Sequence, residues 1–185
     1  MTLTPTPGQT VGPFFHYALP YPNDNELVPP GHPGRIRLHG TVFDGSGAPI
    51  PDALLEVRQA DTAGAIPYVE GALRRDGFTF TGFGRAATDG NGHYSFSTVR
   101  PGAVGQGAVP FFSMCVFARG LLDRLLTRAY LSDTDEGALD GDALLRSLDP
   151  ARRATLVAVA DDTGYQFDIH LQGQFETVFL QHRSR

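Results

Sequence analysis

Apolar and polar residues alternate along several short stretches of this chain. In residues 35–44 (RIRLHGTVFD), Ile36, Leu38 and Val42 occupy even positions, and charged or polar side chains lie between them. A period of two puts alternate side chains on opposite faces of an extended chain, so this stretch predicts a strand with one buried face. The turn GSGAPIP follows, and residues 53–60 (ALLEVRQA) predict the returning strand.

The same pattern continues to the C-terminus. After an Asp-Gly-Asn-Gly turn, a strand carries Tyr94 and Phe96 on one face and ends at Pro101. Only GDALLRSLD, residues 141–149, has helical spacing, with Asp140 or Asp142 as a candidate cap. Further apolar strands are predicted at 111–118, 124–132, 156–160, 165–173 and 176–181. About eight or nine short strands with one short helix predict an all-β fold, a β-sandwich.

The beginning of the chain differs from this pattern. Residues 1–34, here called the arm, include the stretch TPGQTVGPFFHYALP, whose prolines and glycines disfavour a helix. Its aromatic residues Phe14, Phe15 and Tyr17 are unusual for a disordered tail, so we expect them to be buried against this chain or another one. The sequence therefore predicts an irregular arm that packs on a partner subunit, followed by one β-sandwich domain over residues 35–185.

Composition and charge narrow the class of protein. The chain has 185 residues, of which 41% are hydrophobic and 19% charged, as expected for one soluble globular domain. A net charge of −5 without any run of Lys and Arg argues against nucleic-acid binding. We find no apolar stretch long enough to span a membrane and no signal peptide. A single cysteine, Cys115, excludes an intrachain disulfide and is consistent with a cytoplasmic protein.

The residue types alone do not indicate an active site. Ser113 lacks the G-x-S-x-G context of a nucleophile, and Cys115 stands between apolar neighbours that would raise its thiol pKa. No glycine-rich phosphate loop is present, and Asp133, Asp135 and Glu136 are typical of a solvated loop. No two of the six histidines lie within four residues of each other, so no local pair of metal ligands exists.

Longer motifs indicate a family. The stretches HGTVFDGSGAPIPDALLEVRQAD and GRAATDGNGHYSFSTVRPG resemble the intradiol ring-cleaving dioxygenases, as do TPGQTVGPFF, FARG, LTRAYLSD, YQFDIHLQG and ETVFL. The resemblance implies a protein built with a homologous chain, so that alpha and beta subunits assemble together. It also implies a ferric iron held by two tyrosines and two histidines. Tyrosinate oxygens and neutral imidazoles are donors that suit Fe(III).

The ligand positions that this resemblance implies are occupied by other residues. Phe111 and Ser113 stand where the family has His-x-His, and Ala103 stands where a tyrosine follows the RPG stretch. The second tyrosine is also missing, since none occurs between Tyr68 and Tyr94. We therefore expect the beta subunit to bind the iron and this alpha-type chain to bind no metal.

The resemblance also implies substrate-binding residues. In the family the alpha arm lines the substrate cleft of the beta chain, which points to Thr10, Gly12, Pro13 and Phe14 here. Arg128, in LTRAY, matches an arginine at the substrate entrance, and its charge suits a substrate carboxylate. The expected substrates are O₂ and an aromatic dihydroxy acid, 3,4-dihydroxybenzoate. Neither nucleic acid nor a membrane is an expected partner.

Two alternatives remain open at this point. A free-standing transthyretin-like binding module would share the hairpin pattern, although it leaves the arm and the C-terminal motifs unexplained. A diverged dioxygenase could instead act as a single chain with new ligands, for which His93, Tyr94, Tyr165 and His170 are candidates.

Overall fold

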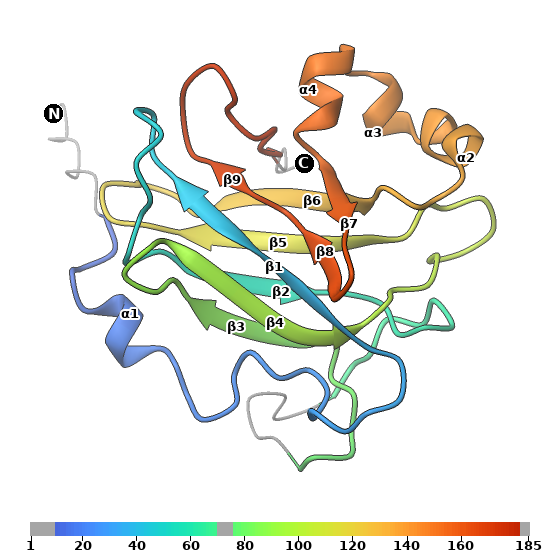
Figure 1. Cartoon of the computed structure of the whole chain (residues 1–185), viewed down its shortest axis with the longest axis horizontal. Coiled ribbons are helices and arrows are strands. Elements are labelled where there is room, and N and C mark those ends of the chain that lie inside the picture. The colour runs from blue at the N-terminus through green and yellow to red at the C-terminus, as the bar shows by residue number, and fades with distance from the viewer. Residues whose placement is uncertain (1–9, 70–75, 182–185) are drawn as a thin grey trace, which may run out of the picture.

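Nine strands form most of the regular structure among the described residues. The computed structural model describes residues 10–69 and 76–181 (Figure 1). Neighbouring strands pair in the order β3-β2-β5-β6-β7-β8-β1-β4, and β9 pairs with β1. This arrangement confirms the all-β prediction. The strands are β1 (Arg35–Phe43), β2 (Leu54–Arg58), β3 (Phe83–Ala87), β4 (His93–Val99), β5 (Phe111–Phe117), β6 (Leu125–Leu131), β7 (Val157–Ala160), β8 (Gly164–Gln166) and β9 (Ile169–His170).

The strands lie in two layers. In Figure 1, β4, β1, β8 and β9 cross in front of β3, β2, β5 and β6, and β7 connects the two layers. We call them the front layer and the back layer. The main core lies between them and includes Leu38, Leu55, Phe96 and Phe112, all fully buried. Burying one face of each layer is what stabilises a two-layer β fold.

The predicted alternation is clear in β1 and in the first half of β4. Leu38 and Val42 of β1 are fully buried, and the residues between them, apart from Gly40, are only partly covered. Tyr94 and Phe96 of β4 share the buried face, and their rings meet edge to face at 5.9 Å. The alternation in the sequence therefore identified β1 and β4 and their inward faces correctly, whereas β3 was not predicted.

The second half of the arm lies along the edges of the two layers. The amide of Leu27 donates to the Ser97 carbonyl in β4 at 2.8 Å, and the amide of Arg85 in β3 donates to the Asp24 carbonyl at 2.8 Å. The Leu27 side chain is buried at a place where Gly84 leaves room, because a Cβ there would overlap it. Residues 24–28 therefore bridge the two edge strands, which would otherwise present unpaired backbone groups.

Three short helices replace the one that was predicted at residues 141–149. They are α2 (Glu136–Gly141), α3 (Ala143–Arg146) and α4 (Pro150–Ala154). Each begins after an aspartate whose carboxylate accepts a hydrogen bond from a backbone amide of the first turn: Asp135, Asp142 and Asp149. The prediction of one helix was wrong because capping aspartates recur every seven residues and restart the helix each time. Asp142 is a cap, as expected.

Two other details differ from the sequence prediction. The arm contains one helical turn, α1 (Phe15–Ala18), although its prolines and glycines argued against any helix. Residues 176–181 form no strand, and residues 165–173 divide into β8 and β9. Among the described residues, no helix is long and apolar enough to cross a membrane.

Gly40 provides a test of the packing between β1 and its neighbours. A Cβ at this position would overlap the carbonyl of Phe167, whereas a Cβ at Gly90 would point into open space. We expect Gly40→Ala to lower the free energy of unfolding by about 1–3 kcal/mol, because the backbone must move apart. Gly90→Ala should change it by no more than about 0.5 kcal/mol. Urea unfolding of both variants measures the difference, and equal stabilities would contradict this packing.

Candidate substrate-facing cavity

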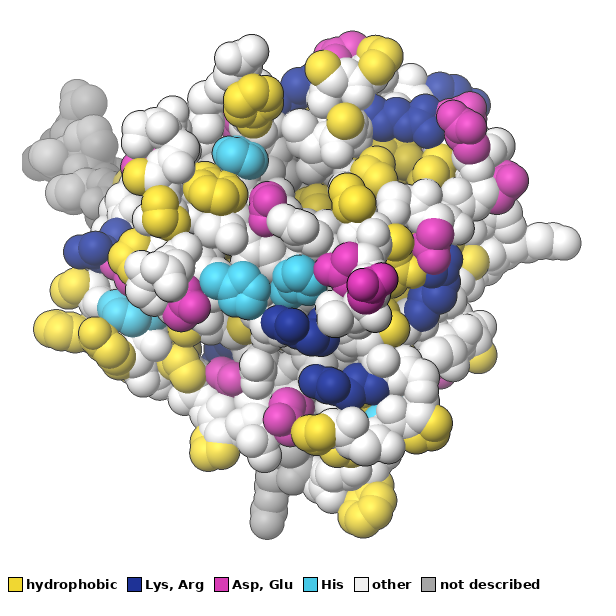
Figure 2. Space-filling model, viewed as in Figure 1, with side chains coloured by type: hydrophobic (Ala, Val, Ile, Leu, Met, Phe, Trp, Pro, Cys, Tyr) yellow, Lys and Arg dark blue, Asp and Glu magenta, His cyan; other side chains and the backbone are white. Residues whose placement is uncertain are grey.

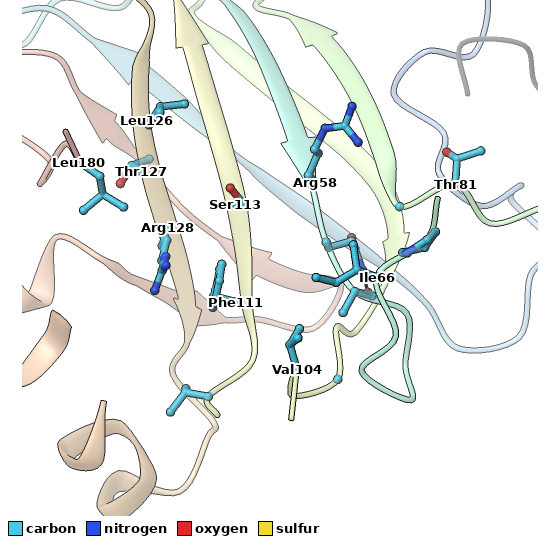
Figure 3. A pocket seen from close by; sticks show the side chains of 16 residues that line it. Arg58, Ile66, Thr81, Val104, Phe111, Ser113, Leu126, Thr127, Arg128 and Leu180 are labelled. Atoms are coloured by element: carbon cyan, nitrogen blue, oxygen red, sulfur yellow. Dashed lines mark hydrogen bonds between the residues drawn. The ribbon is translucent and has the colours of Figure 1, made fainter. Parts of the chain in front are cut away.

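A cavity of about 310 Å³ opens on the outer face of the back layer (Figure 3). It lies over β2, β5 and β6, and loops around residues 66, 82 and 104 complete its wall. The lining of this cavity includes the side chains of Arg58, Phe111, Ser113 and Arg128. Its size is near the lower end of the range of small-molecule sites.

The core determines which residues of β5 face the cavity. Phe112 and Met114 are buried between the layers, at 0% and 1% exposure. Successive side chains of a strand point to opposite faces, so Phe111 and Ser113 must point outward. These are the two positions at which the family resemblance expects histidine ligands. The structure thus brings Phe111 and Ser113, the two positions for which the resemblance implies ligands, into one cavity.

Pairing between strands places two arginines beside Ser113. Arg58 of β2 is the register partner of Ser113, and Ser113 is the register partner of Arg128 in β6. The three residues therefore form one row across three adjacent strands. Arg128 was predicted as a site residue, but Arg58 was missed. Register sets this proximity, and the sequence alone does not reveal it.

Arg128 is held by an aromatic ring and a hydroxyl group. Its guanidinium carbon lies 4.2 Å from the centre of the Phe111 ring, a cation–π arrangement. Its Nη1 donates to the Tyr130 hydroxyl at 3.1 Å, and that hydroxyl donates to Asp142 Oδ1 at 3.2 Å. Burial raises the pKa of Tyr130, so its hydroxyl keeps its proton. Tyr130 and Asp142 thereby orient Arg128, a function that the sequence did not indicate for them.

The residues at the former ligand positions do not fit an iron ion. The Phe111 ring has no lone pair to donate, and a serine hydroxyl is a poor substitute for imidazole. Ala103 offers no side-chain donor either. Among the residues that the structure describes, no group of three or more His, Cys, Asp or Glu side chains could hold a metal ion. Phe111, Ser113 and Ala103 therefore do not form a site for the iron of the family.

The alternative ligand set does not converge on one point. His93 and Tyr94 are neighbours on β4 and so point to opposite faces, with Tyr94 inside the core. The Tyr165 hydroxyl donates to Asp133 at 3.0 Å, and burial raises its pKa to about 12. His170 stacks on an aromatic ring of β1 at 4.8 Å. Each of these groups has a structural role, so the single-chain alternative is not supported.

The thiol of Cys115, a candidate nucleophile, is unreactive near neutral pH. Cys115 is half-buried, and burial raises its pKa to about 11, so the thiol is protonated near neutral pH. Thiolate is the reactive form of cysteine, which agrees with the expectation from its apolar neighbours.

A separate group of ionisable residues lies on the front layer. Figure 2 shows histidine, arginine and acidic side chains side by side across the middle of this face. His39 Nε2 lies 2.7 Å from Asp161 Oδ2, and the His39 and His93 rings are 5.9 Å apart. The hydrogen bond from His39 holds the pKa of Asp161 well below its usual value. This arrangement is a hydrogen-bonded cluster on the front layer and lies away from the cavity.

The predicted arm residues are exposed and do not line the cavity. Thr10, Gly12, Pro13 and Phe14 are all open to solvent in the isolated chain, and none of them lines the cavity around Arg128. Of the arm aromatics, Phe15 is buried, whereas Phe14 and Tyr17 are 71% and 74% exposed. The expectation that all the aromatics would be covered holds within this chain for Phe15 only.

Comparisons with known proteins agree with the motifs. The sequence profile of a family described as "Dioxygenase" matches residues 11–119. The chain is 37% identical to the protocatechuate 3,4-dioxygenase alpha chain of Burkholderia cepacia, over 97% of this chain and 98% of that one. It is also 37% identical to the alpha chain from Pseudomonas putida, over 96% of both chains. Identity to the Burkholderia cepacia beta chain is 34%, over 77% of this chain and 66% of that one.

A solved dioxygenase structure also resembles this chain. The dioxygenase domain of a carbohydrate-binding fusion protein from Streptomyces sp. SirexAA-E superposes with a TM-score of 0.59 and 28% identity. It covers 92% of this chain and 99% of that domain. Because the likeness spans nearly the whole length, a transthyretin-like module is not needed to explain the hairpin pattern. The chain belongs to the intradiol dioxygenase family, whose members are Fe(III)-dependent ring-cleaving enzymes.

Proposed function

We propose that this chain is the alpha subunit of a protocatechuate 3,4-dioxygenase and works with a homologous beta subunit. One observation carries the proposal: β5 presents Phe111 and Ser113 at the positions where a ligand-bearing chain needs histidines. An enzyme of this family needs its iron, so a second chain must supply the ligands. The near full-length likeness to alpha chains supports the same assignment.

The assembled enzyme would cleave 3,4-dihydroxybenzoate with O₂. Both oxygen atoms enter the substrate, and the ring opens between the two hydroxyl-bearing carbons to give 3-carboxy-cis,cis-muconate. The Fe(III) of the beta subunit supplies the redox chemistry with O₂. This chain supplies half of the scaffold and part of the wall around the substrate. The reaction belongs to aromatic compound degradation, and the single reduced cysteine supports a cytoplasmic location.

Arg128 would bind and orient the substrate carboxylate. It forms no ion pair with a carboxylate among the described residues, so its charge is available to a ligand. Phe111 and Tyr130 hold the guanidinium in place before the substrate arrives, which reduces the entropy lost on binding.

The exposed part of the arm would cover the partner's site. Thr10, Gly12 and Pro13 would approach the substrate, and Phe14 would pack over it from one side. Phe14 and Tyr17 present exposed rings 6.5 Å apart, and such amphipathic aromatic pairs are typical of interfaces. The fixed segment at residues 24–28 anchors this part of the arm to its own chain.

Arg128 gives a direct test of substrate recognition. With Arg128→Gln in the co-expressed complex, we expect KM for 3,4-dihydroxybenzoate to rise about three- to a hundredfold, because a charge-assisted hydrogen bond is lost. KM for catechol, which has no carboxylate, should change by less than about twofold. Steady-state kinetics on both substrates measure this. Equal losses on the two substrates would mean that Arg128 supports structure and does not recognise the carboxylate.

The arm gives a test of assembly. Replacing Phe14 and Tyr17 together by serine should weaken binding to the beta subunit by about tenfold or more, because buried aromatics dominate interface energies. Unfolding of the isolated chain should be unchanged, since both rings are exposed there. Phe175→Ser, at a ring that is 65% exposed outside the arm, is the control. Binding that is insensitive to the double substitution would contradict the role proposed for the arm.

A further inference from the structure

The cavity over β5 is lined by positive charges, whereas a metal site needs anionic or neutral donor groups. Sixteen of the described residues line the cavity. Among these, Arg58 and Arg128 are the charged side chains, and there is no aspartate or glutamate. The whole chain, in contrast, carries a net charge of −5. Two positive charges without a counter-charge repel a cation and attract an anion.

In the described part of the chain, the two guanidinium groups lie against aromatic rings and a hydroxyl group. Arg58 is exposed, and its Cζ lies 4.8 Å from the centre of the Phe83 ring. Neither arginine forms an ion pair with a carboxylate in residues 10–69 or 76–181. The neighbouring acid on the same face of β2, Glu56, is paired with Arg85 instead. Both cations are therefore available to a ligand.

The two cations lie toward opposite ends of the cavity. They are separated by β5, so their backbones are about 9–10 Å apart, which is two strand spacings. In Figure 3, Arg128 lies beside Phe111, whereas Arg58 extends away from it on the other side of Ser113. The rest of the cavity wall is mostly apolar and includes Ile66 and Val104.

We propose that this cavity binds an organic dicarboxylate with an apolar or conjugated middle, without any metal. One carboxylate would pair with Arg128 and the other with Arg58, since guanidinium groups match carboxylates in geometry and charge. The Ser113 hydroxyl lies between them and can donate a hydrogen bond. A monocarboxylate would leave one arginine unpaired, and a compact inorganic anion would leave the apolar wall uncovered.

This inference goes beyond the proposed function and stands on the cavity alone. It does connect with the reaction, because ring opening turns a substrate with one carboxylate into a product with three. A ring-opened product has carboxylates at both ends of a conjugated chain, which is the pattern that the cavity fits. Arg128 belongs to both proposals, whereas Arg58 belongs only to this one.

The test uses two probes that differ by one carboxylate. Isothermal titration of the co-expressed complex compares trans,trans-muconate with sorbate, a six-carbon diene of the same double-bond geometry that has a single carboxylate. We expect muconate to bind about tenfold or more tightly than sorbate. Arg58→Gln should lower muconate affinity by about tenfold and change sorbate affinity by less than twofold. Arg37→Gln, on the front layer and outside the cavity, is the matched control and should change neither.

Three results would overturn the inference. Equal affinities of the two probes for the unmodified complex would show that the second cation is not used. An Arg58→Gln variant that keeps full muconate affinity, or that loses both probes equally, would do the same. The dicarboxylate site and the proposed function can fail separately. A complex that turns over substrate, but whose muconate affinity does not depend on Arg58, rejects the dicarboxylate site alone. A complex that shows the difference but has no turnover rejects only the proposed function.

Discussion

The packing of β5 between the two layers is the constraint on which the site depends. Phe112 and Met114 are buried in the core. Because side chains alternate along a strand, Phe111 and Ser113 face the cavity. The resemblance to the family implies metal ligands at these two positions, and this chain has Phe111 and Ser113 there. The ligand that this cavity can bind therefore depends on Phe111 and Ser113 and not on a different fold.

The electrostatics of the cavity differ from those of a ferric site. A site built for a ferric ion needs anionic donors, whereas this cavity holds two arginines and no described acid. Phe111 also gains a new function, because its ring supports the Arg128 guanidinium at 4.2 Å. Tyr130 continues this support to Asp142, which in turn caps α3. Phe111 of β5 and the helical segment after Asp142 thus act together to position one cation.

The sequence predicted the parts of the fold that follow from local patterns. Alternation in β1 and β4 identified the strands and their buried faces, because period two is a local property. The divided helix was missed, since the capping function of Asp135 and Asp149 competes with an apolar spacing that favoured a single helix. Arg58 was missed for a different reason: its neighbours in space belong to β5 and β6, and pairing register is not written in any short stretch. The arm was ambiguous because its two halves differ, with residues 24–28 fixed on their own chain and Phe14 exposed.

The central claim is that this chain is a metal-free but necessary half of an iron enzyme. The most direct test is the iron content of the complex co-expressed from both chains, measured by elemental analysis together with native mass spectrometry. The account predicts one iron per pair of chains, a count that stays the same when Phe111 is replaced by leucine. Two irons per pair, or a loss of iron on that substitution, would contradict it.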